Sequence, residues 1–223
     1  MLINIFVKGV GMINKQLKEY IEKVILPEYE KNEQGHGPKH IEYVVRRSLE
    51  FARQVEGVNL DMVYAVASYH DIGHHIDAKN HERVSAGIFA DDENMYMFFT
   101  PDEIDIIYEA IEDHRASGDH EPRSVYGKIV SSADRRTDVN NVMTTMYTYG
   151  LKNRPEQTLQ ENIEDAYSHI CRKFAKGGYA TSKMYFEDKE YEKLLEQAEY
   201  FKNHKDEFVK YYCDINGIDT KRL

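Results

Sequence analysis

The sequence predicts an all-α protein, a helical bundle followed by additional C-terminal helices. Apolar residues recur every three or four positions along almost all of the 223 residues, as they do on the buried face of an amphipathic helix. Any alternating strand pattern is confined to the first eight residues, and glycines, prolines and capping sequences separate the helical stretches. We expect an N-terminal extension over residues 1–13, a helical domain over 14–150, and helices over 151–223 that pack on that same domain.

Two helices are predicted in the N-terminal part of the chain. An apolar stripe over residues 17–25 predicts the first, with a bend near Pro27. Glycines on both sides of His36 then interrupt the pattern. Pro38 suits the first turn of a second helix, because proline lacks the N–H that this turn leaves unpaired anyway. Apolar residues continue on one face of that helix until it ends near Gly57.

Three helices follow, and each carries a histidine or an aspartate beside its apolar residues. The first begins near Leu60 and includes the pair His70 and Asp71, and the second spans about residues 80–91. The third begins with a Thr-Pro-Asp-Glu sequence at residues 100–103, where the threonine and the glutamate can form a capping box with backbone N–H groups. This third helix extends to His114.

Three more helices are predicted in the C-terminal part. Pro122 opens one of them, whose inner face carries Asp134. After Gly150 come two long helices with regular apolar stripes over residues 159–174 and 191–201. Amphipathic helices must bury their apolar stripes, so we expect these two to cover the bundle, to close one side of the substrate cleft or to form a homodimer surface.

Composition and charge narrow the functional classes. The net charge is 29 − 39 = −10, so a broad basic surface that binds a nucleic-acid duplex is not expected. The two cysteines, Cys171 and Cys213, have neither metal-binding spacing nor the number needed for a disulfide framework. The apolar stretch over residues 1–8 is too short to cross a membrane and lacks the basic start of a signal peptide. We therefore expect a soluble, cytoplasmic protein without a membrane partner.

The most informative residues are a histidine and an aspartate side by side at the end of an apolar run, His70 and Asp71. His40 lies upstream on the apolar face of the second predicted helix, and Asp134 lies downstream on another inward face. A buried carboxylate is costly unless it is paired or bound to a metal. Two imidazoles and two carboxylates suit Mn²⁺, Fe²⁺, Co²⁺, Ni²⁺ or Zn²⁺, with Mg²⁺ as a further candidate. For each residue taken singly, a hydrogen-bonded role in the core is the alternative.

This order of histidines and aspartates resembles the HD domain family of metal-dependent phosphohydrolases, over about residues 36–140. The resemblance implies an HD-like helical bundle in which the four residues bind a divalent metal, and in which Asp71 also orients or bridges the nucleophile. A lysine often follows Ile-Gly in this family, and His74 takes its place here. His74 can still donate to a phosphate, so Asp71 and His74 are the candidate catalytic residues.

Further histidines and cations fit the same family order. His81 and His114 lie between the His-Asp pair and the last aspartate, where family members with two metals also place histidines. They are candidates for a second metal or for direct phosphate contact, with helix-start and core roles as the alternatives. Lys79 and Arg115 are candidates for binding substrate phosphates, with a solvated surface charge as the alternative. Three histidines without an assigned partner are expected in solvated loops: His36, His75 and His120.

The resemblance implies a metal-dependent phosphohydrolase that acts on a nucleotide or another small phosphate ester through a metal-activated water. Two alternatives stay open. One is a non-catalytic metal- or nucleotide-binding regulatory module, which the loss of a ligand would favour, although all four ligands are present. The other is a di-iron oxygenase on the same fold, which requires the additional histidines to be iron ligands.

Overall fold

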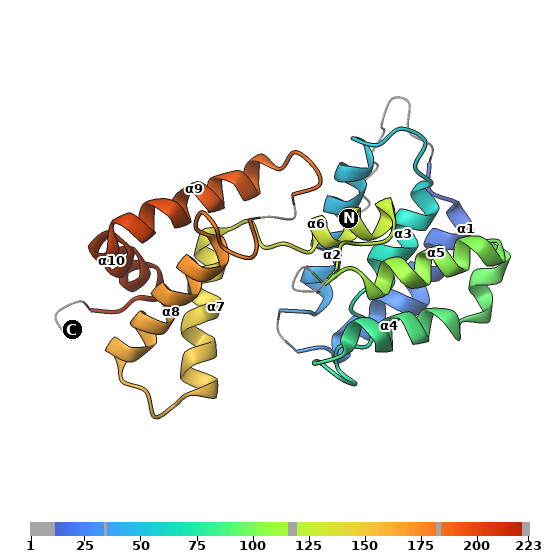
Figure 1. The fold of residues 1–223 in the computed structure, drawn as a ribbon. Coiled ribbons are helices and arrows are strands. Elements are labelled where there is room, and N and C mark those ends of the chain that lie inside the picture. The colour runs from blue at the N-terminus through green and yellow to red at the C-terminus, as the bar shows by residue number, and fades with distance from the viewer. Residues whose placement is uncertain (1–11, 34, 116–119, 182–183, 220–223) are drawn as a thin grey trace. The chain divides into compact units, whose positions relative to one another are not determined.

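In the computed structural model, which describes residues 12–33, 35–115, 120–181 and 184–219, all regular secondary structure is helical. The prediction of an all-α fold is therefore confirmed. The N-terminal extension expected over residues 1–13 lies outside the described residues except for its last two. The elements, which Figure 1 labels along the chain, group into two compact units that divide after Asp134.

The first unit consists of helices packed around one buried helix. In chain order its elements are α1 (Lys15–Tyr20), the π-helical η1 (Ile21–Ile25), the 3₁₀ helix η2 (Leu26–Lys31), α2 (Pro38–Ala52), α3 (Leu60–Tyr69), α4 (His81–Ala90), the 3₁₀ helix η3 (Glu93–Met97), α5 (Pro101–Glu112) and α6 (Val125–Ala133). Helix α3 contacts α2, α4, α5 and α6, and its residues from Met62 to Tyr69 are all buried. His70, the C-cap of α3, and the following Asp71 are fully buried as well, so α3 ends inside the unit.

The N-terminal segment reaches α3 as a continuous but uneven helix. Its buried side chains fall at four-residue steps: Leu17, Ile21, Ile25 and Tyr29. After α1 the helix widens into the π-helical turn, and the tighter η2 then begins at Leu26 with Pro27 in its first turn, so the helix type changes where a bend was expected. Tyr29 is thereby fully buried, and its hydroxyl donates to Ser68 O of α3 at 3.0 Å.

The start of α5 is as predicted, whereas the start of α6 is not. Thr100 N–H donates to Glu103 Oε2 at 2.9 Å and Thr100 Oγ1 accepts from Glu103 N, so the predicted capping box is present. The expectation that Pro122 opens a helix is wrong. Helix α6 begins at Val125 because the side chain of Ser124 accepts from a backbone N–H of the first turn and so caps the helix there.

The second unit is a bundle of four α-helices within the described residues. They are α7 (Val139–Asn153), α8 (Leu159–Phe174), α9 (Lys189–Asn203) and α10 (Lys205–Asn216). Helices α8 and α9 carry the two predicted apolar stripes, whereas α7 and α10 were not predicted. The stripes meet in a core of aliphatic and aromatic side chains that includes Ile163, Ile170, Phe174, Leu194, Phe201, Phe208 and Tyr212.

Gly150 lies inside α7 and is not a break in the chain. It is buried, and a Cβ at this position would lie 1.7 Å from Asn162 Nδ2 of α8, so only glycine allows this approach of the two helices. The boundary expected at residue 150 thus falls within a helix of the second unit. That residues 151–223 pack on the helices of the first unit, or form a homodimer surface, stays a prediction.

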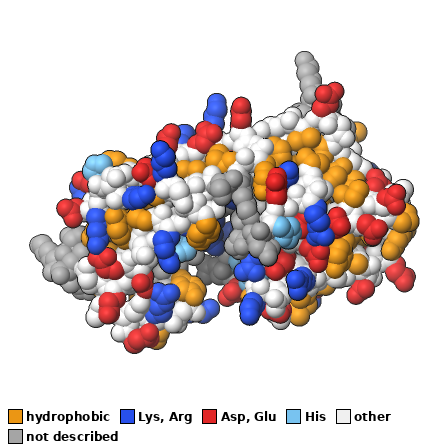
Figure 2. All heavy atoms as spheres, viewed as in Figure 1, with side chains coloured by type: hydrophobic (Ala, Val, Ile, Leu, Met, Phe, Trp, Pro, Cys, Tyr) orange, Lys and Arg blue, Asp and Glu red, His pale blue; other side chains and the backbone are white. Residues whose placement is uncertain are grey.

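The surface carries charges of both signs. On the face that Figure 2 shows, acidic and basic side chains are interspersed. A negative net charge of −10 with this mixture does not provide the broad basic area that a duplex would need on that face. Among the described helices, none is both long enough and apolar enough to cross a membrane.

Replacing Gly73 by alanine should destabilise the first unit. Gly73 N–H donates to Ser85 Oγ of α4 at 3.0 Å, and a Cβ on Gly73 would lie 2.6 Å from Val84 Cγ1 and 2.9 Å from Ser85 N. Overpacking of this kind costs roughly 1–3 kcal/mol, which urea denaturation would measure as a lower free energy of unfolding.

Gly87→Ala provides the matched control, because a Cβ on Gly87, also in α4, would meet no atom within 4 Å. This change should raise the free energy of unfolding by about 0.5–1 kcal/mol, since alanine favours the helix. Equal unfolding free energies for the two variants would contradict the close packing of the turn at Gly73 against α4.

Candidate metal centre

Helix α3 ends at a pair of buried polar residues. His70 is the C-cap of α3, Asp71 lies in the turn that follows, and both side chains are fully buried. Ile72 N–H donates to Tyr69 O at 3.2 Å and His74 N–H donates to Asp71 O at 3.0 Å, so backbone hydrogen bonds close the turn. A carboxylate without solvent requires compensating charge or hydrogen bonds, and the surrounding elements supply them.

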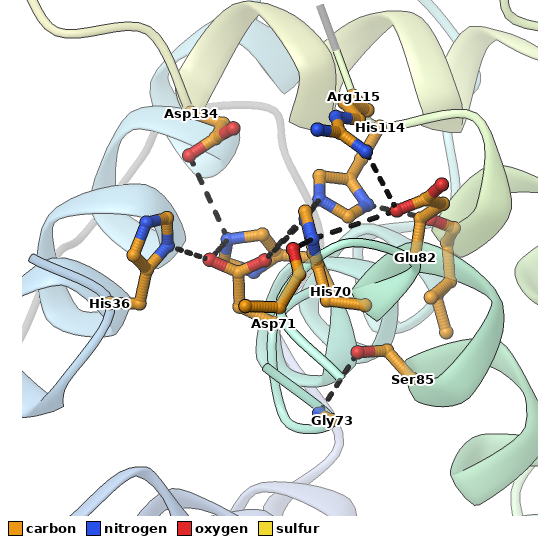
Figure 3. A network of polar contacts seen from close by, with 12 residues as sticks. His36, His70, Asp71, Gly73, Glu82, Ser85, His114, Arg115 and Asp134 are labelled. Carbon is orange, nitrogen blue, oxygen red and sulfur yellow. Dashed lines mark hydrogen bonds and ion pairs between the residues drawn. The ribbon is translucent and has the colours of Figure 1, made fainter. Parts of the chain in front are cut away.

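Four side chains, that of Asp71 included, converge on one point at the end of α3. We call His40, His70, Asp71 and Asp134 the first group, because one donor atom of each lies within 4.8 Å of the others. His40 Nε2 of α2 lies 3.2 Å from Asp134 Oδ1, 3.3 Å from His70 Nε2 and 3.4 Å from Asp71 Oδ2. Asp134 reaches the group as the C-cap of α6 (Figure 3). The structure thus brings together the four residues that the sequence suggests as ligands.

Two further histidines approach the other oxygen of Asp71. His81 Nε2, at the start of α4, lies 3.2 Å from Asp71 Oδ1, and His114 Nε2, just beyond α5, lies 3.4 Å from the same atom. The two ring nitrogens are 3.3 Å apart. We call Asp71, His81 and His114 the second group. Asp71 therefore faces one group with Oδ2 and the other with Oδ1, as a carboxylate that bridges two cations does.

The hydrogen bonds of the rings show that this donor set fits cations. His70, His81 and His114 each direct Nδ1 at a carbonyl oxygen three residues upstream, at 2.8, 3.1 and 2.6 Å. A carbonyl only accepts, so Nδ1 carries the proton and Nε2 keeps its lone pair for the centre. In addition, Asp71 Oδ1 is buried and has no hydrogen-bond partner. The lone pairs of these Nε2 atoms and the negative carboxylate oxygen repel each other. A divalent cation bound between the nitrogens and the oxygen removes that repulsion.

The pKa values indicate the same need for positive charge. Burial would raise the pKa of Asp71, but the charge of His70 and hydrogen bonds from neighbouring histidines outweigh burial and bring that pKa well below its usual value. Burial would lower the pKa of His40, but hydrogen bonds with Asp134 and Asp71 outweigh it and raise the pKa to about 9. Burial lowers the pKa of His70 to about 4. Without a cation, a proton on His40 therefore offsets the carboxylates.

The other candidate residues lie around this centre. His74 is buried, and its ring is stacked on that of His36 with 3.9 Å between centroids. Burial and the neighbouring charge of His36 lower the pKa of His74. Arg115 Nη1 lies 3.5 Å from Glu82 Oε2 (Figure 3). The same nitrogen donates to Lys79 O at 2.8 Å, so Arg115 connects the segment after α5 to the start of α4. The side chains of Lys79 and Arg115 are exposed, and the roles suggested for these two residues and for His74 stay predictions.

His36 is a further member of the centre, and the sequence alone does not predict it. The expectation that it is a solvated loop residue is wrong, because His36 Nδ1 lies 2.7 Å from Asp71 Oδ2. His36 and His40 are four residues apart, the spacing of neighbours on one helix face, but α2 begins only at Pro38, so helical periodicity does not place His36 on that face. His75 and His120 are exposed, as expected, but each has a partner: His75 Nδ1 lies 3.2 Å from Asn32 Oδ1, and His120 Nε2 lies 2.9 Å from Asp113 Oδ1.

Comparisons with known proteins agree with this geometry. Residues 39–137 match the family model described as HD domain, and this range includes every member of the first and second groups. The family resemblance seen in the sequence is therefore confirmed. The crystal structure of a Lactobacillus plantarum protein, a structural-genomics target, matches with a TM-score of 0.56 at 20% sequence identity, over 91% of this chain and 100% of that one. At this identity the likeness concerns the fold alone. No curated protein matches the chain in sequence.

Metal binding should strengthen as the pH rises. His40 must be neutral to act as a ligand, and its pKa without a cation is raised to about 9, so binding displaces a proton below that pH. The apparent affinity should therefore rise by about tenfold per pH unit between about pH 6 and pH 8 from this proton alone. Isothermal titration calorimetry with Mn²⁺ in buffers of different ionisation enthalpy measures both the affinity for the metal and the number of protons released on binding. An affinity independent of pH would contradict a ligand role for His40.

Replacement of both His81 and His114 by alanine tests the second group. If these histidines bind a cation, the metal content should be close to two per chain in the original protein and close to one in the double variant. Inductively coupled plasma mass spectrometry after dialysis measures this content. His169→Ala, which changes a histidine of α8 in the second unit, should leave it unchanged.

Direct phosphate contact by His81 and His114 predicts a different result. The double variant would then keep its metal content, while the KM for a phosphate substrate would increase. An unchanged metal content together with an unchanged KM would exclude both roles and leave the two histidines as hydrogen-bonded core residues.

Proposed function

Residues 39–137 form an HD domain, and on this premise we propose that the protein is a metal-dependent phosphohydrolase acting on a nucleotide or another small phosphate ester. HD domains imply membership of a superfamily of metal-dependent phosphohydrolases. The observation that carries the proposal is the position of Asp71, which turns one carboxylate oxygen to each group of histidines. A single buried carboxylate with this geometry suits a centre of one or two divalent cations.

The residues of the centre are arranged in advance for such chemistry. A bound divalent cation would polarise a phosphoryl oxygen and lower the pKa of a water molecule, which are the two requirements for attack on phosphorus near neutral pH. Asp71 joins the two groups, so its position determines the spacing between them. Three of the imidazoles are each fixed by an Nδ1 hydrogen bond to the backbone. Their Nε2 atoms therefore need no reorientation when substrate arrives, which is the preorganisation that electrostatic catalysis requires.

The surroundings of the centre support a small anionic substrate. The stacked rings of His36 and His74 lie next to Asp71, and imidazole N–H groups can donate to phosphate oxygens. Lys79 and Arg115, exposed near the second group, add positive charge for the phosphates of a nucleotide. A net charge of −10 opposes a long polyanion, so a small molecule is a better substrate than a nucleic-acid duplex.

Asp71→Ala should abolish hydrolysis while the helical content stays close to normal. A cation contributes several kcal/mol of transition-state stabilisation, and about 1.4 kcal/mol corresponds to tenfold in rate, so kcat should fall by roughly 10²-fold or more. The assay is phosphate release from a panel of nucleotides and small phosphate esters with Mn²⁺, Fe²⁺, Co²⁺, Ni²⁺, Zn²⁺ and Mg²⁺ in turn. Far-UV circular dichroism monitors the fold, and His169→Ala is the control that should keep full activity.

Two outcomes of this screen would replace the proposal. Substrate-dependent oxygen consumption by the iron-loaded protein, without phosphate release, would identify an oxygenase. Tight binding of a nucleotide without turnover under any metal would identify a regulatory module. Phosphate release that persists in Asp71→Ala would place the active site elsewhere in the chain.

A further inference from the structure

We infer that Tyr29, Asn32 and His36 form a clamp that positions Asp71, and that this clamp is part of the active site although it precedes the matched HD domain. The inference rests on the proposed function only in that Asp71 holds metal. Each of the three residues contacts a different polar group of Asp71: its backbone N–H, its backbone carbonyl and its carboxylate. We call these three residues the Asp71 clamp.

Tyr29 holds the backbone N–H. Asp71 lies beyond the last residue of α3, and its N–H donates to the hydroxyl of Tyr29 at 3.2 Å. The same hydroxyl donates its own proton to Ser68 O at 3.0 Å. Tyr29 therefore continues the hydrogen bonding of α3 past the helix end. Because its ring is fully buried, it is a rigid support for the start of the turn.

Asn32 holds the backbone carbonyl and joins three segments. Its Nδ2 donates to Asp71 O and to His36 O, both at 2.9 Å, and its Oδ1 accepts from His75 N at 3.0 Å. One amide side chain thus links the end of η2, the loop before α2 and the turn after Asp71. All three contacts are to backbone atoms, so the side chain fixes the path of the chain at these points.

His36 holds the carboxylate itself. Its Nδ1 donates to Asp71 Oδ2 at 2.7 Å, which is shorter than the distances from Oδ2 to the histidines of the first group, 3.4 Å to His40 and 3.5 Å to His70. A hydrogen bond on Oδ2 fixes the rotation of the carboxylate plane, and the other oxygen, Oδ1, is then left facing His81. The position of His36 therefore decides whether Asp71 can face both groups at once.

His36 is in turn held on its two sides. Its ring is stacked on His74 with an interplanar angle of 13°, and its backbone carbonyl accepts from Asn32. The clamp is consequently a connected unit whose parts support one another. A purely structural role would affect folding, whereas the clamp predicts an effect on metal binding in a protein that is still folded.

The test is a Co²⁺ titration followed by visible absorption, which reports both the affinity and the geometry of the bound ion. Residues that orient metal ligands typically contribute about 10–100-fold to metal affinity, so His36→Ala should weaken Co²⁺ binding by that factor and change the spectrum. His36→Asn, which keeps an N–H donor near the place of Nδ1, should restore binding to within a few-fold of the original. Asn32→Asp, which keeps the size but loses the donor, should weaken binding as His36→Ala does.

His204→Ala, an exposed histidine in the second unit, is the control and should bind Co²⁺ normally. Thermal unfolding of each variant separates loss of binding from loss of folding. Co²⁺ affinity and spectrum unchanged in folded His36→Ala and Asn32→Asp would overturn the clamp, and so would equal weakening in His36→Ala and His36→Asn. If Co²⁺ binding follows the predicted order while no phosphate compound is hydrolysed, the proposed function fails and the clamp stands. Absence of Co²⁺ binding in the original protein would overturn both.

Discussion

The burial of one carboxylate, that of Asp71, is the constraint on which the first unit depends. Its side chain has no exposed surface at the end of a helix that is itself enclosed by its neighbours. An isolated charge in such a place would cost far more than the free energy of unfolding of a domain of this size. Imidazoles from α2, α4, the end of α3 and the segment after α5 therefore converge on it. The histidines of the centre compensate for this buried negative charge. The same need for positive charge makes the centre suited to binding a divalent cation.

The position of the ligands around Asp71 also depends on close packing between the turn at Gly73 and α4. Gly73 presents no side chain to α4, so Val84 and Ser85 can lie against the turn. This close approach places the first residue of α4, His81, beside Asp71 Oδ1. A larger residue at position 73 would push away the helix that supplies a ligand. Fold and site therefore share the same contacts, and a change in one alters the other.

The sequence was sufficient for the parts of the site that lie within a regular helix or directly at its end. His40, His70, Asp71 and Asp134 could be recognised because their order and their inward faces follow from helical periodicity. His36 could not, since a turn whose path depends on tertiary contacts brings it to Asp71. Gly150 was misread for a similar reason: the sequence shows a helix-breaking residue, but its missing side chain serves the contact with Asn162 on another helix. The conformational propensities of residues predict only local structure. The positions of His36 and Gly150 depend instead on contacts with residues distant in sequence, Asp71 and Asn162.

The distribution of the two groups along the chain has a thermodynamic consequence. Their members are spread along the chain from α2 to Asp134, which directly follows α6. A cation held there would therefore connect segments that separate completely on unfolding. Such an ion binds the native state and has few organised ligands in the unfolded chain. By mass action, free metal at about 100 times its Kd would add about 2.7 kcal/mol to the free energy of unfolding. The metal concentration in the surroundings would then determine the fraction of the protein that stays folded.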